Sequence, residues 1–221
     1  MSRGLFVTGT DTGIGKTVAA VAILRSLVAS GRRAVGMKPV SAGIDEGTQV
    51  NADVAAMDAA GNVAAPLAER NPYAFGPPIA PHVAAARAGV AIDLERIADA
   101  YARLAARADA VVVEGAGGPL VPIDARRDML DIAQRLRVPV VLVVGVRLGC
   151  LNHALAAELA IRSRGLELAG WIANRIDPAM EAADDTLAAL DARLPAPRVA
   201  DLAWGDPATP GPVSLDRLGF G

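Results

Sequence analysis

The chain lacks most of the features that mark extracellular, membrane or nucleic-acid-binding proteins. Its 221 residues contain one cysteine, which excludes an internal disulfide framework and indicates a reducing compartment. The formal net charge is −2, without the basic excess that attracts nucleic acid or an anionic membrane. The longest apolar stretch, residues 138–146, falls far short of the roughly 20 residues that span a bilayer. The apolar run near the N-terminus is too short for a signal peptide. These observations predict a cytoplasmic globular protein.

Aromatic residues are also scarce, at 3% of the chain, whereas 52% of the residues are hydrophobic, chiefly Ala, Val and Leu. Such side chains fill helix faces and strands, which excludes a disordered chain. The length corresponds to about one to one and a half typical domains and is enough to bury one large core. Because no internal repeat or second domain is visible, residues 1–221 are expected to form one domain.

Short apolar runs alternate with longer segments of helical periodicity. Strands are expected at 5–7, 34–37, 110–113, 138–144 and 168–173, and helices at 16–29, 93–107, 126–136, 150–164 and 179–193. The alternation predicts a doubly wound α/β fold, with helices on both faces of a mostly parallel sheet. Loops are expected at 39–51, 71–81 and 115–125, with region 44–70 as a possible lid or substrate loop and 205–214 as a loose tail.

A glycine-rich segment, GTDTGIGKT at residues 9–17, follows the first predicted strand and opens the first helix. Backbone N–H groups and the helix dipole at such a turn bind polyphosphate. Lys16 would reach the β- and γ-phosphates and Thr17 would bind Mg²⁺, as in a fold of the P-loop NTPase type. In the usual motif, four residues separate the first glycine from the glycine that precedes the lysine. Here Thr10 stands where that first glycine is usual, and Gly9 lies one residue before it. The alternative is a chance glycine-rich turn.

Two more charged residues, Lys38 and Glu114, follow predicted strands, whose carboxyl ends share one edge of a parallel sheet, and a third, Asp53, lies further along the chain. Glu114 begins the segment EGAGG and is placed to hold Mg²⁺ or its water, with a tight turn and a solvated glutamate as the alternative. Lys38 could stabilise anionic oxygens, although a surface lysine that ends a strand is the simpler reading of this residue alone. Asp53 is a possible second carboxylate for the metal, or simply an acidic residue in the first turn of a helix.

Two further segments are candidates for binding substrate and base. The N–H groups of residues 150–152 (Cys150, Leu151 and Asn152), at a helix start, would suit a substrate carboxylate. The Cys150 thiol itself is expected to be buried and unreactive. Asn174 at a strand end matches an adenine edge, with a turn-capping asparagine as the alternative.

Together these stretches resemble the dethiobiotin synthetase family over nearly the whole chain. The resemblance rests on GTDTGIGKT (9–17), KPV (38–40), NPYAF with the following PH (71–82), VEGAGG (113–118), VGVRLGCLNHA (144–154) and AGWIAN (169–174). The longer P-loop is that family's form. The resemblance implies a homodimer that converts 7,8-diaminononanoate, CO2 and MgATP to dethiobiotin, ADP and phosphate. The ring would close through a carbamate and a carbamic–phosphoric anhydride.

The resemblance also implies roles for individual residues. Lys16 and Lys38 would be catalytic, and Thr17, Asp53 and Glu114 would hold Mg²⁺. The implied ATP contacts are Gly13, Ile14, Gly15, Lys16, Thr17, Val18, Asp53, Glu114, Gly115, Ala116, Gly117, Asn174, Arg175, Ala203, Trp204 and Gly205. The implied substrate contacts are Lys38, Ser41, Ala42, Cys150, Leu151 and Asn152.

The chain departs from the family pattern at three places. Ala42 stands where a hydroxyl residue is usual, Thr186 where some members have a Tyr, and Ala203 where some have a Pro before Trp204. Three other functions compete with the implied one. A related ATP-dependent ligase could act on another carboxylic acid. A partitioning-type ATPase switch is less well matched, because the P-loop has no lysine before Lys16 and the tail is no amphipathic helix. A non-enzymatic nucleotide-binding module would leave Lys38 without a role.

Overall fold

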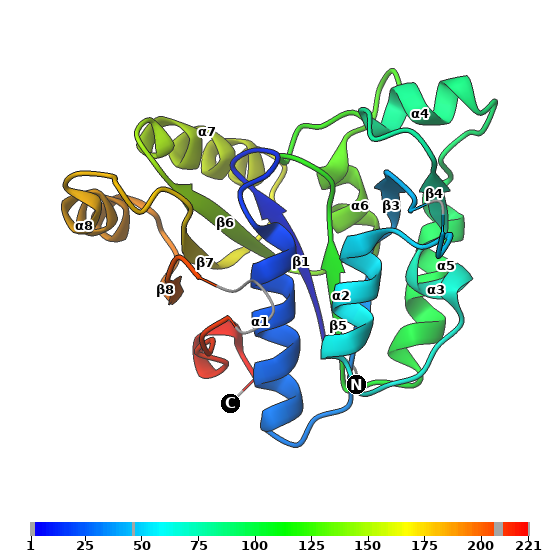
Figure 1. The fold of residues 1–221 in the computed structure, drawn as a ribbon, viewed down its shortest axis with the longest axis horizontal. Helices are drawn as coiled ribbons and strands as arrows, with labels where there is room; N and C mark the ends of the chain where they lie inside the picture. The colour runs from blue at the N-terminus through cyan, green and yellow to red at the C-terminus, as the bar shows by residue number, and fades with distance from the viewer. Residues whose placement is uncertain (1–2, 46, 206–209, 221) are drawn as a thin grey trace.

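The protein is described by a computed structural model, which covers residues 3–45, 47–205 and 210–220. Its centre is a six-stranded parallel sheet in the order β2-β5-β1-β6-β7-β8 (Figure 1). The strands are β1 (Arg3–Gly9), β2 (Ala34–Met37), β5 (Ala110–Glu114), β6 (Val140–Val146), β7 (Leu168–Arg175) and β8 (Arg198–Leu202). Because β1 lies between β5 and β6, the strand order reverses at β1, and a ligand site is expected at its carboxyl end.

Helices cover both faces of the sheet, so the predicted fold class is confirmed (Figure 1). One face packs mainly on α1 (Lys16–Ala29), with the C-terminal segment around η1 (Asp216–Leu218) beside it. The other face packs on α5 (Leu94–Ala105), α6 (Met129–Leu136), α7 (Cys150–Ser163) and α8 (Ala183–Arg193). The remaining helices are α2 (Ala52–Ala60), α3 (Leu67–Arg70) and α4 (Pro81–Arg87).

The strand sequences explain this two-sided burial. In β1, Leu5 and Val7 face the α1 core, while Phe6 between them faces the opposite core. All seven residues of β6 are buried, as expected for a central parallel strand covered on both faces. None of the helices in the described ranges has the length and apolarity needed to cross a membrane.

Most predicted elements are confirmed, and the helix starts are the main differences among them. The helix 16–29 and the strand 34–37 have the predicted bounds. The helix predicted from 126 begins at Met129, because Asp128 and Asp131 form a capping box there. The helix predicted from 179 begins at Ala183, after Ala182 in a left-handed conformation that interrupts the helix.

Several segments differ from the sequence predictions. The predicted loops 39–51 and 71–81 contain β3 (Val40–Ala42) and β4 (Tyr73–Phe75), which form a separate two-stranded parallel sheet. Strands of three residues are too short to show a periodic pattern. The edge strand β8 was also missed. In region 44–70, α2 packs its Val54 and Met57 into the protein, so this part is a packed helix rather than a free lid.

The predicted loose tail, residues 205–214, is packed at its C-terminal end. Residues 206–209 lie outside the described residues. Val213 is buried, and the N–H group of Ser214 donates to the Val199 carbonyl at 2.9 Å. This part of the tail therefore continues into the segment that covers the sheet beside α1.

Candidate active site

The loop between β1 and α1 forms an anion-binding turn. Gly13 and Gly15 have φ angles of 74° and 81°, in the left-handed region that favours glycine. Gly15 is the N-cap of α1 and has no side chain to occupy the first N–H groups of the helix. The Lys16 ammonium folds back over the loop and donates to the Asp11 carbonyl at 2.8 Å. The turn therefore presents backbone N–H groups and one ammonium to the same space.

Gly15 and Gly13 give a matched test of this loop. A Cβ atom on Gly15 would lie 2.0 Å from the Asn174 amide nitrogen, whereas one on Gly13 would meet nothing within 4 Å. Both positions carry the left-handed strain of about 1–2 kcal/mol. We expect Gly15→Ala to weaken ATP binding, measured by titration calorimetry, by about tenfold more than Gly13→Ala, the gap that a further 1.4 kcal/mol gives. Equal losses would show that close packing against Asn174 has no part in forming the loop.

Four side chains from separate segments meet beside this loop. The Lys38 ammonium, just after β2, donates to Asp53 Oδ2 at 2.6 Å and to Glu114 Oε1 at 2.7 Å. The Thr17 hydroxyl donates to the same Glu114 oxygen at 3.0 Å. The structure thus brings together the proposed metal-binding residues and the second lysine, although they are as much as 97 residues apart in the chain.

Local structure explains how these groups are held. Glu114 ends the buried strand β5, and Thr17 lies in the first turn of α1. The Asn71 amide donates to the Lys38 carbonyl at 2.7 Å and so fixes the backbone at that lysine. Asp53 lies in the first turn of α2, whose N-cap is Asn51, so the carboxylate of Asp53 is not the cap and instead pairs with Lys38.

Lys16 and Lys38 are the only two lysines in the chain, against 20 arginines. Both are buried, with 7% and 5% of their surface exposed, and both line the same cavity. An ammonium is a compact charge on a flexible stem, whereas a guanidinium is a planar fork suited to carboxylates. The chain uses arginine everywhere else, so lysine is confined to this site. The sequence contained this signal, and residue counts alone would have strengthened the assignment of Lys38.

Burial and charge shift the pKa values of the site in opposite directions. Burial alone would lower the pKa of Lys38, but Glu114 and Asp53 outweigh it, so this pKa lies above its usual value. Burial lowers the pKa of Lys16, and the Glu114 charge only partly offsets that effect. Burial would raise the pKa of Asp53, but Lys38 outweighs it and keeps the pKa below its usual value. Lys38 and Asp53 therefore form an ion pair.

The oxygen donors at this point fit Mg²⁺. Glu114 is 1% exposed, and its second oxygen, Oε2, is buried without a hydrogen-bond partner among the described residues. A carboxylate oxygen left in this way needs a cation or a water molecule. Two carboxylates and a hydroxyl suit Mg²⁺, which prefers oxygen ligands and keeps several waters or phosphate oxygens.

A cavity of about 990 Å³ opens over this cluster. Its polar wall carries Lys16, Thr17, Lys38, Asp53 and Glu114 together with backbone of the P-loop and of residues 116–117. Apolar residues of other segments also line it, and we refer to six of them as the apolar wall: Ala42, Pro78, Ile79, Ala80, Pro81 and Val121. The apolar wall was missed in the sequence, because residues 71–81 were interpreted as a loop. The cavity can thus hold a polyphosphate next to an aliphatic chain.

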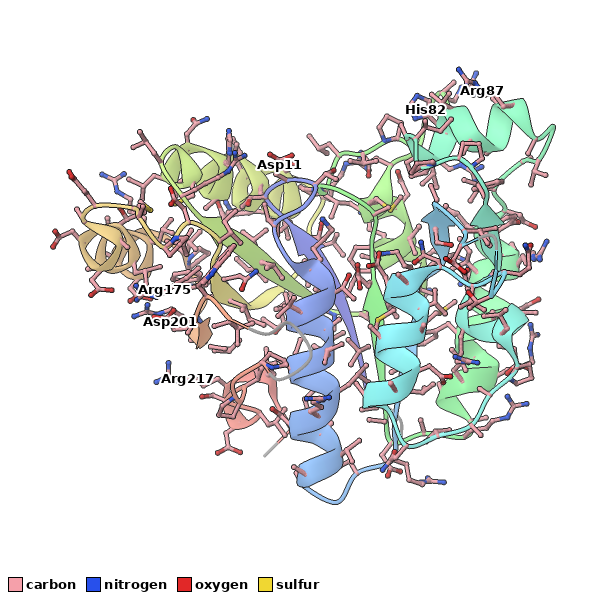
Figure 2. The ribbon with its side chains drawn as sticks, viewed as in Figure 1. Asp11, His82, Arg87, Arg175, Asp201 and Arg217 are labelled. Carbon is pink, nitrogen blue, oxygen red and sulfur yellow. The ribbon has the colours of Figure 1, made fainter. Side chains whose placement is uncertain are left out.

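Other predicted nucleotide contacts lie beside the P-loop rather than in this cavity. The Asn174 amide donates to the Ile14 carbonyl at 2.8 Å, so one of its polar groups holds the P-loop. Arg175 pairs with Asp201 at 2.9 Å and Asp184 at 2.6 Å, which raises the pKa of its guanidinium. Figure 2 shows Arg175 and Asp201 together at the ends of β7 and β8. Ala203, Trp204 and Gly205 are exposed just after β8.

The predicted substrate contacts are divided between two places. Ala42 lines the cavity, but Ser41 is fully buried and bonds to Asn71 Oδ1 at 2.9 Å, so the structure does not bring its hydroxyl to the cavity. The N–H group of Cys150 is not free either, because it donates to the Arg147 carbonyl at 3.0 Å. The thiol is buried, as expected. Leu151 and Asn152 lie exposed at the start of α7.

One contact near the P-loop was missed from the sequence. Arg147 pairs with the Asp11 carboxylate at 2.7 Å, which ties the turn after β6 to the P-loop. Asp11 lies at the outer end of the P-loop in Figure 2. Asp11 follows β1 and Arg147 follows β6, the strand that pairs with β1. Opposite charges after two neighbouring strands were the sequence signal for this contact.

This arrangement of parallel sheet, glycine-rich turn, lysine and paired carboxylates defines a P-loop NTPase. Among solved structures, the chain is similar to the MinD cell division protein of Aquifex aeolicus (TM-score 0.57, 15% identity, 99% of this chain and 87% of that chain). It is also similar to a ParA family ATPase of Chlorobium tepidum (TM-score 0.55, 14% identity, 99% of this chain and 89% of that chain). At such identities the likeness shows the fold alone.

Relatives of much higher sequence identity show which family the chain belongs to. A family model described as an AAA domain matches residues 3–210. The ATP-dependent dethiobiotin synthetase of Nitrosospira multiformis is 49% identical over 204 residues, or 92% of this chain and 89% of that protein. The one from Aromatoleum aromaticum is 51% identical over 211 residues, or 93% and 94%. The chain therefore belongs to the ATP-dependent dethiobiotin synthetase family, as the motifs suggested, and is an ATP-dependent ligase.

Proposed function

We propose that the protein closes the cyclic urea of dethiobiotin from 7,8-diaminononanoate, CO2 and MgATP, and releases ADP and phosphate. The observation that carries the proposal is the convergence of both lysines, Asp53 and Glu114 on the P-loop beside an apolar wall. The names and coverage of the relatives support the same reaction.

The proposed reaction needs charge neutralisation more than a strong base. One substrate amine adds to CO2 and loses a proton, which gives a carbamate. A carbamate oxygen attacks the γ-phosphorus and ADP leaves. The second amine then attacks the carbonyl carbon, the ring closes and phosphate leaves with that oxygen. Lys16 would hold the β- and γ-phosphate oxygens, and Lys38 would hold the carbamate and the transferred phosphoryl group.

The nucleotide would lie along the P-loop. Mg²⁺, held by Thr17, Asp53 and Glu114, would neutralise charge on the polyphosphate. Backbone N–H groups of residues 13–18 and 115–117 would bind the phosphates. Adenine would lie near Asn174 and Arg175, against the exposed backbone of residues 203–205. The Asn174 amide supports this placement, since its nitrogen bonds to Ile14 and its oxygen has no hydrogen-bond partner among the residues that the structure describes.

The reacting end of the substrate would lie at Lys38, beside the apolar wall. We place its carboxylate at the N–H groups of Leu151 and Asn152, with Cys150 forming the turn. The acid and its primary amide are expected to differ in binding by about 1–3 kcal/mol, the range for charge-assisted hydrogen bonds. Steady-state kinetics with both compounds measure this difference. Equal KM values would remove the carboxylate site from the proposal and favour a different substrate.

The proposal includes a homodimer in the cytoplasm. Leu148, just before α7, is 90% exposed, and Leu151 and Leu159 on α7 are 37% and 54% exposed. Exposed leucines on and beside one helix support an interface with a second copy. Sedimentation velocity is the test, and a single monomeric species at working concentration would contradict the dimer.

A product assay tests the reaction itself. With MgATP, bicarbonate and 7,8-diaminononanoate, we expect dethiobiotin and ADP in equal amounts, identified by mass spectrometry. Omission of bicarbonate should stop both. The alternative is a ligase that activates the carboxylate of another acid. That ligase would form ADP without bicarbonate, and such a result would replace the proposed function.

A further inference from the structure

The Lys38 ammonium occupies the place between the two carboxylates that a metal ion would need. It lies 2.6 Å from Asp53 and 2.7 Å from Glu114, so both carboxylates share one cation. In the proposed function Asp53 and Glu114 would also hold Mg²⁺. The oxygens that Lys38 contacts, Asp53 Oδ2 and Glu114 Oε1, cannot keep the ammonium and bind a metal directly at the same point.

We propose that Lys38 is an internal counter-ion that fills the metal site of the nucleotide-free enzyme and is exchanged for the divalent cation when MgATP binds. The inference rests on the Mg²⁺ site of the proposed function, but not on the identity of the substrate. It adds a second role for Lys38, which precedes its contact with the reacting oxygens.

Charge and burial support the exchange. Glu114 is 1% exposed and the Lys38 side chain is 6% exposed, so neither charge is held by bulk water. An uncompensated carboxylate at such a depth is strongly unfavourable, which requires a cation at this point in every state of the enzyme. With Lys38 present, that requirement is met before any metal arrives. The Oε2 atom of Glu114, which has no hydrogen-bond partner in the described part of the chain, is available as the first contact of the entering cation.

The geometry also gives the displaced ammonium somewhere to go. Lys38 lines the 990 Å³ cavity beside Lys16, and four rotatable carbon bonds allow its ammonium to swing from the carboxylates into that space. The phosphate and carbamate oxygens of the proposed reaction would lie there. Metal entry would then free the ammonium for catalysis. The consequence is an order of binding in which the metal alone binds weakly and enters together with the nucleotide.

The test measures Mn²⁺ binding to the nucleotide-free protein by the EPR signal of the free ion. Lys38→Met removes the ammonium but keeps a side chain of similar length. Lys16→Met is the matched control, because Lys16 is equally buried in the same cavity but contacts the Asp11 carbonyl. We expect Lys38→Met to bind Mn²⁺ about tenfold or more tightly than the wild type, and Lys16→Met to gain less than about threefold.

Two results would overturn the exchange. An unchanged or weaker Mn²⁺ affinity in Lys38→Met would show that the ammonium does not compete with the metal. Equal gains in both variants would show a general effect of charge rather than occupation of the site. Neither result would affect ring closure, which the product assay tests separately, and failure of the product assay would leave the exchange intact.

A second measurement uses the wild-type protein and does not depend on a variant that folds poorly. Because the chain has two lysines, protein labelled with carbon-13 at the lysine ε-carbon gives two signals, which Lys16→Met assigns. We expect the Lys38 signal to shift in step with Mg²⁺ binding, and by more than the Lys16 signal. Saturation of the site by Mg²⁺ with an unmoved Lys38 signal would contradict the proposal.

Discussion

Lys16→Ala is expected to lower the turnover of ATP and substrate by about 10²–10³-fold, the loss found when one preorganised charge-stabilising group is removed. This loss is expected because of where the Lys16 ammonium lies. The Lys16 ammonium lies over the P-loop turn, bonded to the Asp11 carbonyl, where charge develops on the phosphoryl oxygens. Steady-state assay of ADP release measures the effect, and nucleotide affinity should also fall.

The control for this prediction is Arg193→Ala. Arg193 is an exposed cation in the last turn of α8 and is not among the residues that line the cavity. Surface substitutions of this kind usually change free energies by less than about 0.5 kcal/mol, so turnover should stay within about twofold of the wild type. Similar losses in both variants would mean that the P-loop lysine has no specific part in phosphoryl transfer.

Lys38→Ala is expected to lower turnover by a comparable factor, about 10²–10³-fold, while ATP binding stays within a few-fold of the wild type. The nucleotide lies mainly on residues 13–18, whereas Lys38 faces the carboxylates and the apolar wall. Titration calorimetry with a non-hydrolysable MgATP analogue separates binding from turnover. An equal loss of turnover and of ATP affinity would show that Lys38 acts on the nucleotide rather than on the reacting oxygens.

The same variant should also be less stable without metal. Lys38→Ala leaves Glu114 buried without its cation, and breaking a buried pair in this way costs about 3–5 kcal/mol. Thermal unfolding with and without MgATP therefore accompanies the kinetics, which must be measured with the metal present. An unchanged melting temperature in the metal-free variant would show that the ion pair contributes little to the fold.

The sequence was sufficient for the central architecture, because long periodic segments and two-sided apolar strands carry strong signals. The run Val140–Val146 is buried throughout, and the helix Lys16–Ala29 has its predicted bounds. The sequence was insufficient for β3, β4 and β8. Each of these strands is short or at a sheet edge, and tertiary pairing rather than local pattern defines it.

The candidate site likewise has a part that could be predicted from the sequence and a part that could not. Residues of the P-loop and Glu114 could be placed because each follows a predicted strand, and parallel strands end at one edge. The contact between Asp53 and Lys38 depends on the packing of α2, a helix that the sequence indicated only through the alternative reading of Asp53. The hydrogen bond between the Ser41 hydroxyl and Asn71 depends in the same way on the pairing of β3 with β4. The sequence gives no signal for a polar contact when one of its partners lies on an element that the sequence does not predict.

The most direct test of the central claim follows one oxygen atom. The substrate diamine is incubated with MgATP and CO2 labelled with oxygen-18, for a time too short for exchange with water, and the released phosphate is analysed by mass spectrometry. If a carbamate oxygen attacks the γ-phosphorus, the phosphate carries one labelled oxygen and the cyclic urea keeps the other. Unlabelled phosphate, released with or without ring closure, would contradict the proposed route.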